Sequence, residues 1–163
     1  MSLLNLNYFE LFDIDINIDI NLDDLEKKYI TLQNKFHPDN FTRSTNLEKS
    51  MAIQISTHIN DGYKILKDLV SRVDYILHIN EFKVDDSITF KNSEFLSNQI
   101  VLSERIESSN SDQINEIKKE LKNKIKEITN TLKNDFAKMD FESMHSNLSM
   151  IKFYKKNLIN LLT

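Results

Sequence analysis

The chain has 163 residues, of which 40% are hydrophobic and 28% charged, and its formal net charge is −4 at pH 7. One Gly and one Pro argue against an all-β fold, which needs turn residues at short intervals, and they exclude a glycine-rich phosphate loop. The absence of Cys excludes disulfides, thiolate zinc sites and cysteine-ligated clusters, and the acidic balance disfavours nucleic acid as a partner.

The N-terminal segment is acidic. Its first 24 residues hold six acidic side chains and no Lys or Arg, whereas secretory signals and transit peptides need early positive charge. The sequence contains no apolar run near the ~20 residues that cross a membrane. We therefore expect a cytoplasmic protein with no membrane partner.

The first half of the chain is predicted to be helical. Residues 8–12 form a short apolar segment of one or two helical turns. Alternating Ile residues at 14–20 are assigned to an extended connector, because no second strand exists to pair with them. A helix is predicted over 22–36, where apolar side chains form one stripe: Leu22, Leu25, Tyr29, Leu32 and Phe36. It must end near residue 36, because Pro38 disfavours helical geometry at His37.

Two further helices are expected at about 47–67 and 69–79, after a loop at 40–46. Residues 80–92 are polar and lack periodicity, so we assign them to a linker. The N-terminal domain would therefore span residues 1–79.

The C-terminal part, residues 93–163, predicts three antiparallel helices that form a small bundle. The central helix is the clearest, because apolar residues recur at steps of three and four: Ile114, Ile117, Leu121, Ile125, Ile128, Leu132, Phe136 and Met139. Shorter helices are expected at 93–107 and 141–162, the latter with the core stripe Met144, Leu148, Ile151, Leu158 and Leu162. The predicted fold class is therefore all-α.

The one sharp local motif is His37-Pro38-Asp39, which follows the 22–36 helix. Asp and Pro are common turn residues, so one interpretation is a turn that stops the helix. An acid–base role has weak support, because no nucleophile or second base stands nearby in the sequence. A metal site has weak support as well, because the four His residues show no ligand spacing.

The surroundings of this motif resemble a J domain, the module of DnaJ-type co-chaperones. The resemblance covers roughly residues 6–79 and rests on three elements in order: Tyr8-Phe9-Glu10-Leu11-Phe12, the His-Pro-Asp turn, and Ile59-Asn60-Asp61-Gly62-Tyr63-Lys64-Ile65-Leu66. Two positions depart from the usual pattern, with Asn40 where Lys is common and Gly62 where Ala is usual.

In that family the His-Pro-Asp turn and the basic face of the preceding helix engage a heat-shock ATPase of the 70-kilodalton class. The resemblance therefore implies an ATPase-binding site made of His37, Pro38, Asp39, Lys28 and Lys35. Pro38 would fix the backbone of the turn, so that the Asp39 carboxylate is presented to a partner cation at low entropic cost.

The C-terminal bundle narrows the resemblance. General DnaJ proteins carry a Gly/Phe-rich linker and a cysteine zinc module, and this sequence has neither. A J domain followed by a small three-helix bundle resembles the HscB family of iron–sulfur cluster assembly. That family has its scaffold-binding residues at positions that match 95–100 and 152–153. The resemblance implies two partners, an HscA/DnaK-type heat-shock ATPase and an IscU-type scaffold protein.

Helical phase independently distinguishes three apolar residues of the bundle. Leu96 and Ile100 lie about 100–140° from the Phe95–Ile106 face of the first bundle helix, and Phe153 lies opposite the core stripe of the third. Such residues can be scattered surface apolars, can pack on the first domain, or can form a binding patch. With the resemblance, we predict a scaffold-binding patch of Leu96, Ile100 and Phe153.

We therefore expect a co-chaperone and not an enzyme. It would bring an iron–sulfur scaffold protein to a dedicated heat-shock ATPase and stimulate ATP hydrolysis there. ATP, magnesium and the cluster would belong to the partners, so no cofactor is expected in this chain. Two alternatives remain: a J-domain protein that delivers another client, and a helical adaptor in which His-Pro-Asp is a turn and nothing more.

Overall fold

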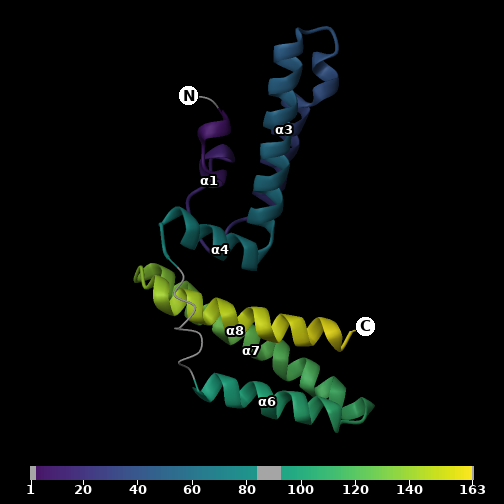
Figure 1. Cartoon of the computed structure of the whole chain (residues 1–163), viewed down its shortest axis with the longest axis vertical. Coiled ribbons are helices and arrows are strands. Elements are labelled where there is room, and N and C mark those ends of the chain that lie inside the picture. Colours follow the sequence, from purple (N-terminus) through teal and green to yellow (C-terminus); the bar gives the residue numbers. More distant parts are fainter. Residues whose placement is uncertain (1–2, 84–92, 163) are drawn as a thin grey trace. The chain divides into compact units, whose positions relative to one another are not determined.

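A computed structural model of the chain describes residues 3–83 and 93–162 (Figure 1). Its elements are η1 Leu3–Asn5, α1 Tyr8–Leu11, α2 Leu22–Phe36, η2 Pro38–Phe41, α3 Asn46–Lys67, α4 Leu69–Ile79, α6 Ser93–Glu107, α7 Ser111–Ala137 and α8 Phe141–Asn160. The all-α prediction is confirmed, and the helices predicted at 22–36, 69–79 and 93–107 have the predicted bounds. Within the described ranges, no helix is long and apolar enough to cross a membrane.

The chain divides into two compact units, Met1–Asn80 and Glu81–Thr163. This division falls at the start of the segment predicted as a linker, of which residues 84–92 lie outside the described residues. Each unit has its own buried side chains and is considered by itself below.

In the first unit α3 is the central element, because α1, α2, α4 and η2 all pack against it. The predicted connector at 14–20 forms no regular element, as expected. Within it Ile18 is 1% exposed whereas Ile16 is 43% exposed, so one of the alternating Ile residues enters the core. Asn21 then caps α2, since its Oδ1 accepts hydrogen bonds from the backbone N–H groups of Asp23 and Asp24.

A buried arginine holds the connector in place. Arg72 is 6% exposed, and its Nε donates a 3.0 Å hydrogen bond to the carbonyl oxygen of Ile18. Its Nη1 donates to the carbonyl oxygen of Leu66 at the end of α3. Burial lowers the pKa of Arg72, and the charges of Asp19 and Asp68 oppose this effect. Arg72 therefore ties the entry of α2 to the exit of α3.

Gly62 allows α1 to approach α3 closely. A Cβ atom at this position would lie 2.7 Å from Cδ1 of Tyr8 and 3.1 Å from Cε2 of Phe12. The Tyr8 ring is in turn held between His58, at 5.1 Å between ring centroids, and Tyr75, at 4.7 Å. The departure from the usual Ala therefore has a steric reason, because the Tyr8 ring occupies the space of a Cβ.

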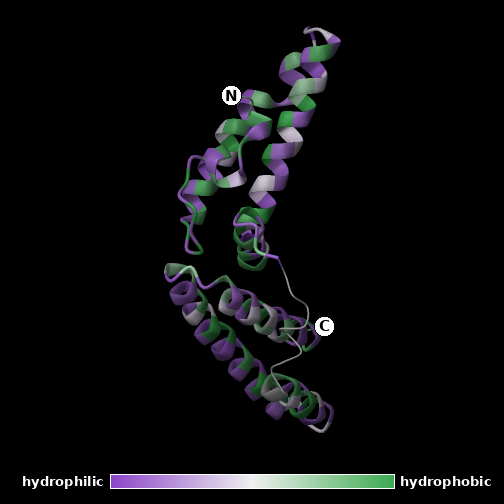
Figure 2. Cartoon of the chain, turned by 60° about the vertical axis from the view of Figure 1, so that its left-hand side comes forward, coloured by the Kyte–Doolittle hydropathy of each residue, from purple (hydrophilic) through white to green (hydrophobic). Residues whose placement is uncertain are grey.

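The second unit is a three-helix bundle, and Figure 2 shows hydrophobic and hydrophilic residues alternating along its helices. A buried cluster joins all three helices: Phe95 from α6, Ile117 and Leu121 from α7, and Tyr154 from α8. Polar caps set the ends of the longer helices. Asn110 forms a capping box at the start of α7, and Asp140 accepts a hydrogen bond from the backbone N–H of Ser143 at the start of α8.

Three residues of the predicted apolar stripes are exposed, so these stripes do not lie wholly in the core. Leu22 is 45% exposed because it is the first residue of α2, at the edge of the packed region. Met139 and Leu162 are 59% and 64% exposed and lie beyond the ends of α7 and α8. Met139 also has a φ of 58°, the left-handed geometry that often ends helices. An apolar stripe in the sequence thus overestimates the buried core at the ends of a helix, where neighbouring helices no longer cover it.

Candidate partner-binding sites

The His-Pro-Asp motif forms a short 3₁₀ turn between α2 and α3. Pro38 stands at the first position of η2, and the backbone N–H of Asp39 donates a 3.3 Å hydrogen bond to Nδ1 of His37. Asn40, one of the departures from the family pattern, donates from Nδ2 to the carbonyl oxygen of Asn34, 2.7 Å away. The amide thus closes the end of α2 and fixes the turn to it.

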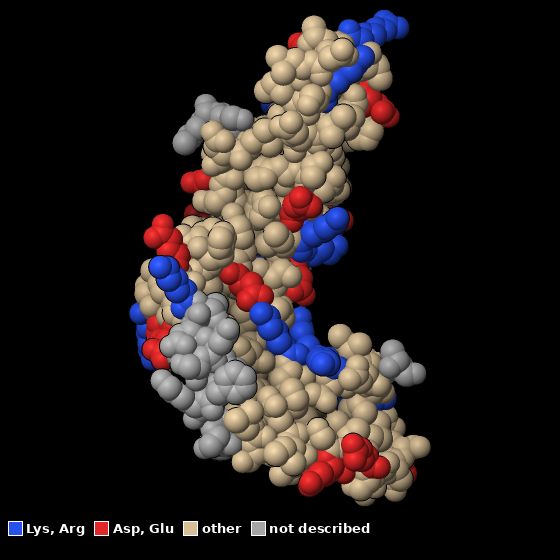
Figure 3. Space-filling model, in the orientation of Figure 1, with Lys and Arg blue, Asp and Glu red and all other residues tan. Residues whose placement is uncertain are grey.

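The charged group of this turn is open to a partner. The side chain of Asp39 is 85% exposed and that of His37 is 53% exposed, with 3.6 Å between Oδ2 of Asp39 and Nδ1 of His37. Figure 3 shows Lys and Arg side chains at the end of the first unit where α2 gives way to α3. A carboxylate on a fixed turn can accept a charge-assisted hydrogen bond without first being ordered.

The two lysines carried over from the family differ in their surroundings. Lys28 pairs with Asp24 at 3.1 Å, and its Nζ donates a 2.7 Å hydrogen bond to the carbonyl oxygen of Asp13. Lys28 therefore fastens the turn after α1 to α2. Lys35 is exposed, and its Nζ lies 5.3 Å from the centre of the Phe36 ring. Of these two cations, Lys35 is the more accessible to a partner.

The bundle carries a groove between α6 and α8. Its volume is about 310 Å³, and its lining includes Ile100, Ser103, Glu104, Glu107 and Phe153. Ile100 is 62% exposed and Leu96, one turn earlier on the same helix, is 38% exposed. The structure thus brings Ile100 and Phe153 together in this groove and leaves Leu96 and Ile100 at the surface.

The prediction that Phe153 lies off the core is wrong in part. Its ring is half-buried and packs edge-to-face on Phe95, with 5.6 Å between ring centroids. The predicted core stripe of this helix did not include Tyr154. Tyr154 belongs to the buried cluster that contains Phe95, whereas Leu158 is partly buried against that cluster. Two adjacent rings of α8 therefore contact α6: Tyr154 lies in the core and Phe153 lines the groove.

Sequence reasoning also missed residues beside this patch. Val101 is 60% exposed and follows Ile100 directly, so a second apolar side chain stands at the surface of α6, about 100° around the helix from Ile100. Glu104 and Glu107 add negative charge to the groove. Helical phase would have found Val101, since it lies about 120° from the direction of Phe95.

Comparison with known proteins identifies the class of chain. The family model described as the HSCB C-terminal oligomerisation domain matches residues 91–161. The co-chaperone protein HscB homolog of Acinetobacter baylyi is 30% identical over 156 residues, which cover 94% of this chain and 87% of that protein. The homolog of Colwellia psychrerythraea is 37% identical over 103 residues, which cover 63% of this chain and 59% of that relative.

Solved structures agree with this relationship. Chaperone HscB from Vibrio cholerae superimposes with a TM-score of 0.85 at 26% identity, covering 96% of both chains. The human co-chaperone protein HscB gives a TM-score of 0.90 at 25% identity, covering 97% of this chain and 81% of that one. The fold, a J domain followed by a helical bundle, is therefore that of a class of co-chaperone proteins. Specifically, the chain belongs to the HscB family, whose members are chaperone regulators rather than enzymes.

Proposed function

We propose that this chain brings an iron–sulfur scaffold protein of the IscU type to a heat-shock ATPase of the HscA/DnaK type and stimulates ATP hydrolysis there. Residues 1–79 would be the ATPase-binding domain and residues 93–163 the client-binding domain. The reaction would take place in the cytoplasm. ATP hydrolysis itself would be carried out by the partner.

The observation that carries this proposal is that the Asp39 carboxylate is exposed on a fixed turn. Its carboxylate is 85% exposed, yet the turn beneath it is fixed by Pro38, by the hydrogen bond to His37 and by Asn40. A solvated carboxylate on a fixed turn contributes little to folding, so its use is better sought in a partner. Lys35, two residues before the motif, adds a cation that would steer the chain toward an acidic surface.

The client side of the proposal is supported by the bundle. Leu96 and Ile100 are apolar and exposed on α6, and the groove beside Ile100 is closed by Phe153 and edged by Glu104 and Glu107. An apolar centre with a charged rim is typical of a protein-binding surface. The family resemblance supports scaffold binding at residues 95–100 and 152–153.

The test uses the purified chain with the HscA/DnaK-type ATPase and the IscU-type scaffold of its own organism. Asp39→Asn should abolish stimulation of ATP hydrolysis while helicity and melting stay within the ±0.5 kcal/mol typical of surface changes. Asp15→Asn is a matched control, because Asp15 is also exposed and lies in the connector away from the turn. Full stimulation by the Asp39→Asn variant would refute the proposed role of the turn.

A further inference from the structure

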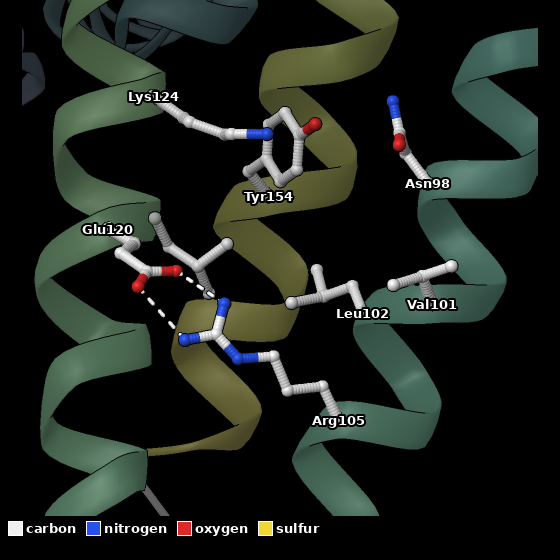
Figure 4. A pocket seen from close by; sticks show the side chains of 8 residues that line it. Asn98, Val101, Leu102, Arg105, Glu120, Lys124 and Tyr154 are labelled. Carbon is white, nitrogen blue, oxygen red and sulfur yellow. Dashed lines mark hydrogen bonds and ion pairs between the residues drawn. The ribbon is translucent and has the colours of Figure 1, made fainter.

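A second pocket opens on the opposite flank of α6, between α6 and α7 and over the Tyr154 ring of α8 (Figure 4). Its volume is about 120 Å³, and its apolar lining includes Val101, Leu102 and Leu121. Figure 4 shows the Arg105–Glu120 pair at one end of the pocket, and Lys124 and Asn98 on either side of Tyr154 at the other. Asn98 lies within the 95–100 stretch of the family resemblance, whereas the pocket shares no lining residue with the groove described above.

The charges of the pocket are arranged unevenly. Arg105 donates hydrogen bonds from Nη1 and Nη2 to both carboxylate oxygens of Glu120, at 2.6 and 2.9 Å. These hydrogen bonds are the main reason that the pKa of Glu120 lies below its ordinary value. The two groups therefore neutralise each other at one end of the pocket.

Lys124 lies at the other end of the pocket. Its charge also lowers the pKa of Glu120, although less than the hydrogen bond from Arg105 does. Its ammonium group faces the ring of Tyr154, with Nζ 5.6 Å from the ring centre. Because Arg105 and Glu120 are neutral in sum, the pocket combines a net positive charge with an apolar wall.

The pocket lies next to the proposed client surface on the same two helices. Val101 lines the pocket and Ile100 lines the groove, and these two neighbours are 60% and 62% exposed on the outer face of α6. On α8, Tyr154 lies in the pocket and Phe153 in the groove, with 5.4 Å between their ring centroids. A protein lying across α6 would reach both hollows at once.

We propose that this pocket receives the carboxylate of an Asp or Glu side chain of the scaffold protein, next to an apolar residue that packs on Val101. The inference rests on the proposed function, because it assumes that the scaffold lies across α6. Lys124 would supply the charge, and the Asn98 amide is a further hydrogen-bond donor. Partial removal of water by the apolar wall would strengthen the ion pair.

Substitution of Lys124 tests the proposal. Lys124→Gln should weaken scaffold binding by at least about threefold, and Lys124→Glu by at least about tenfold, measured by calorimetry at low and physiological salt. The control is Lys126→Glu, which makes the same charge change on an exposed residue about 200° away around α7. Its affinity should stay within about twofold of the unaltered chain.

The outcomes separate this inference from the proposed function. Equal losses with Lys124→Glu and Lys126→Glu would reduce the effect to net charge and refute the pocket. Unchanged binding by both Lys124 variants would also refute it, while the loss expected from Leu96→Ala with Ile100→Ala would still support scaffold binding on α6. Self-association of the chain that disappears in Lys124→Glu would assign the pocket to a second copy and overturn the choice of occupant.

A cross-link gives a direct reading of the occupant. A zero-length carbodiimide joins a lysine amine to a carboxylate with loss of water, so it couples groups that already form an ion pair. In the complex, mass spectrometry should find an amide between Lys124 and an Asp or Glu of the scaffold. Cross-links from other lysines of the bundle, with none from Lys124, would overturn the proposal.

Discussion

Gly62→Ala gives the sharpest test of how the first unit is packed. In an open helix this change should stabilise the chain by about 1 kcal/mol, because Gly is the weaker helix former. Here the new Cβ would lie 2.7 Å from Tyr8, and that ring is held by His58 and Tyr75 on its other sides. Overpacking of this kind costs about 1–3 kcal/mol. We therefore expect net destabilisation of up to about 2 kcal/mol.

The assay is chemical denaturation followed by circular dichroism. The matched control compares Ser50→Ala with Ser50→Gly, because Ser50 is exposed on the same helix and the difference reports the Gly-to-Ala propensity gain alone. Tyr8→Leu in the Gly62→Ala background should remove most of the penalty, so that a double-mutant cycle shows coupling between the two sites. Stabilisation of Gly62→Ala equal to the Gly-to-Ala difference at residue 50 would refute the reasoning, since the ring would then move aside freely.

Two other predictions concern the second unit. Leu96→Ala with Ile100→Ala should weaken scaffold binding at least about thirtyfold, with a small shift in melting temperature. The control Ile117→Ala removes a buried side chain and should cost about 2–5 kcal/mol of stability. A folded double variant that binds the scaffold normally would argue against the patch. The backbone N–H of Ser143 lowers the pKa of Asp140 below 3.8, so the Asp140 cap stabilises the bundle above that pH and is lost as pH falls through the lowered pKa. Thermal melts at pH 5 and about pH 3 should therefore show a wild-type advantage over Asp140→Asn that shrinks in acid, and a constant difference would contradict it.

The pattern of apolar residues predicted most of the helices because each helix buries one stripe. The helix at 22–36 also had a capping Asn21 before it and Pro38 after it, and these local signals set its bounds. Long-range packing was harder to predict. Nothing near Gly62 in the sequence shows that Tyr8 fills the space beside it. From the sequence, Gly62 therefore predicts a less stable helix, whereas in the structure it permits a close contact with Tyr8.

In the candidate sites too, local features could be predicted and long-range contacts could not. The His-Pro-Asp turn is local, and its exposure could be predicted from the helix stop at Pro38. The role of Lys28 could not, because its hydrogen-bond acceptor is the carbonyl oxygen of Asp13, which no side-chain pattern reveals. A basic face on a helix thus contains both cations that stabilise the fold and cations that are accessible to a partner. The contacts of each side chain in the structure distinguish the two kinds.

The bundle places two different hollows on the flanks of one helix, and this arrangement has a consequence for specificity. The groove beside Ile100 carries Glu104 and Glu107, whereas the pocket beside Val101 carries Lys124 and a net positive charge. A client that fits both would need an apolar centre flanked by charges of opposite sign, in one order along its surface. Apolar burial alone would accept many partners, while the wrong order of charges would place like charges together. The apolar residues of α6 would therefore supply affinity, and the charges on either side would select the client and its orientation.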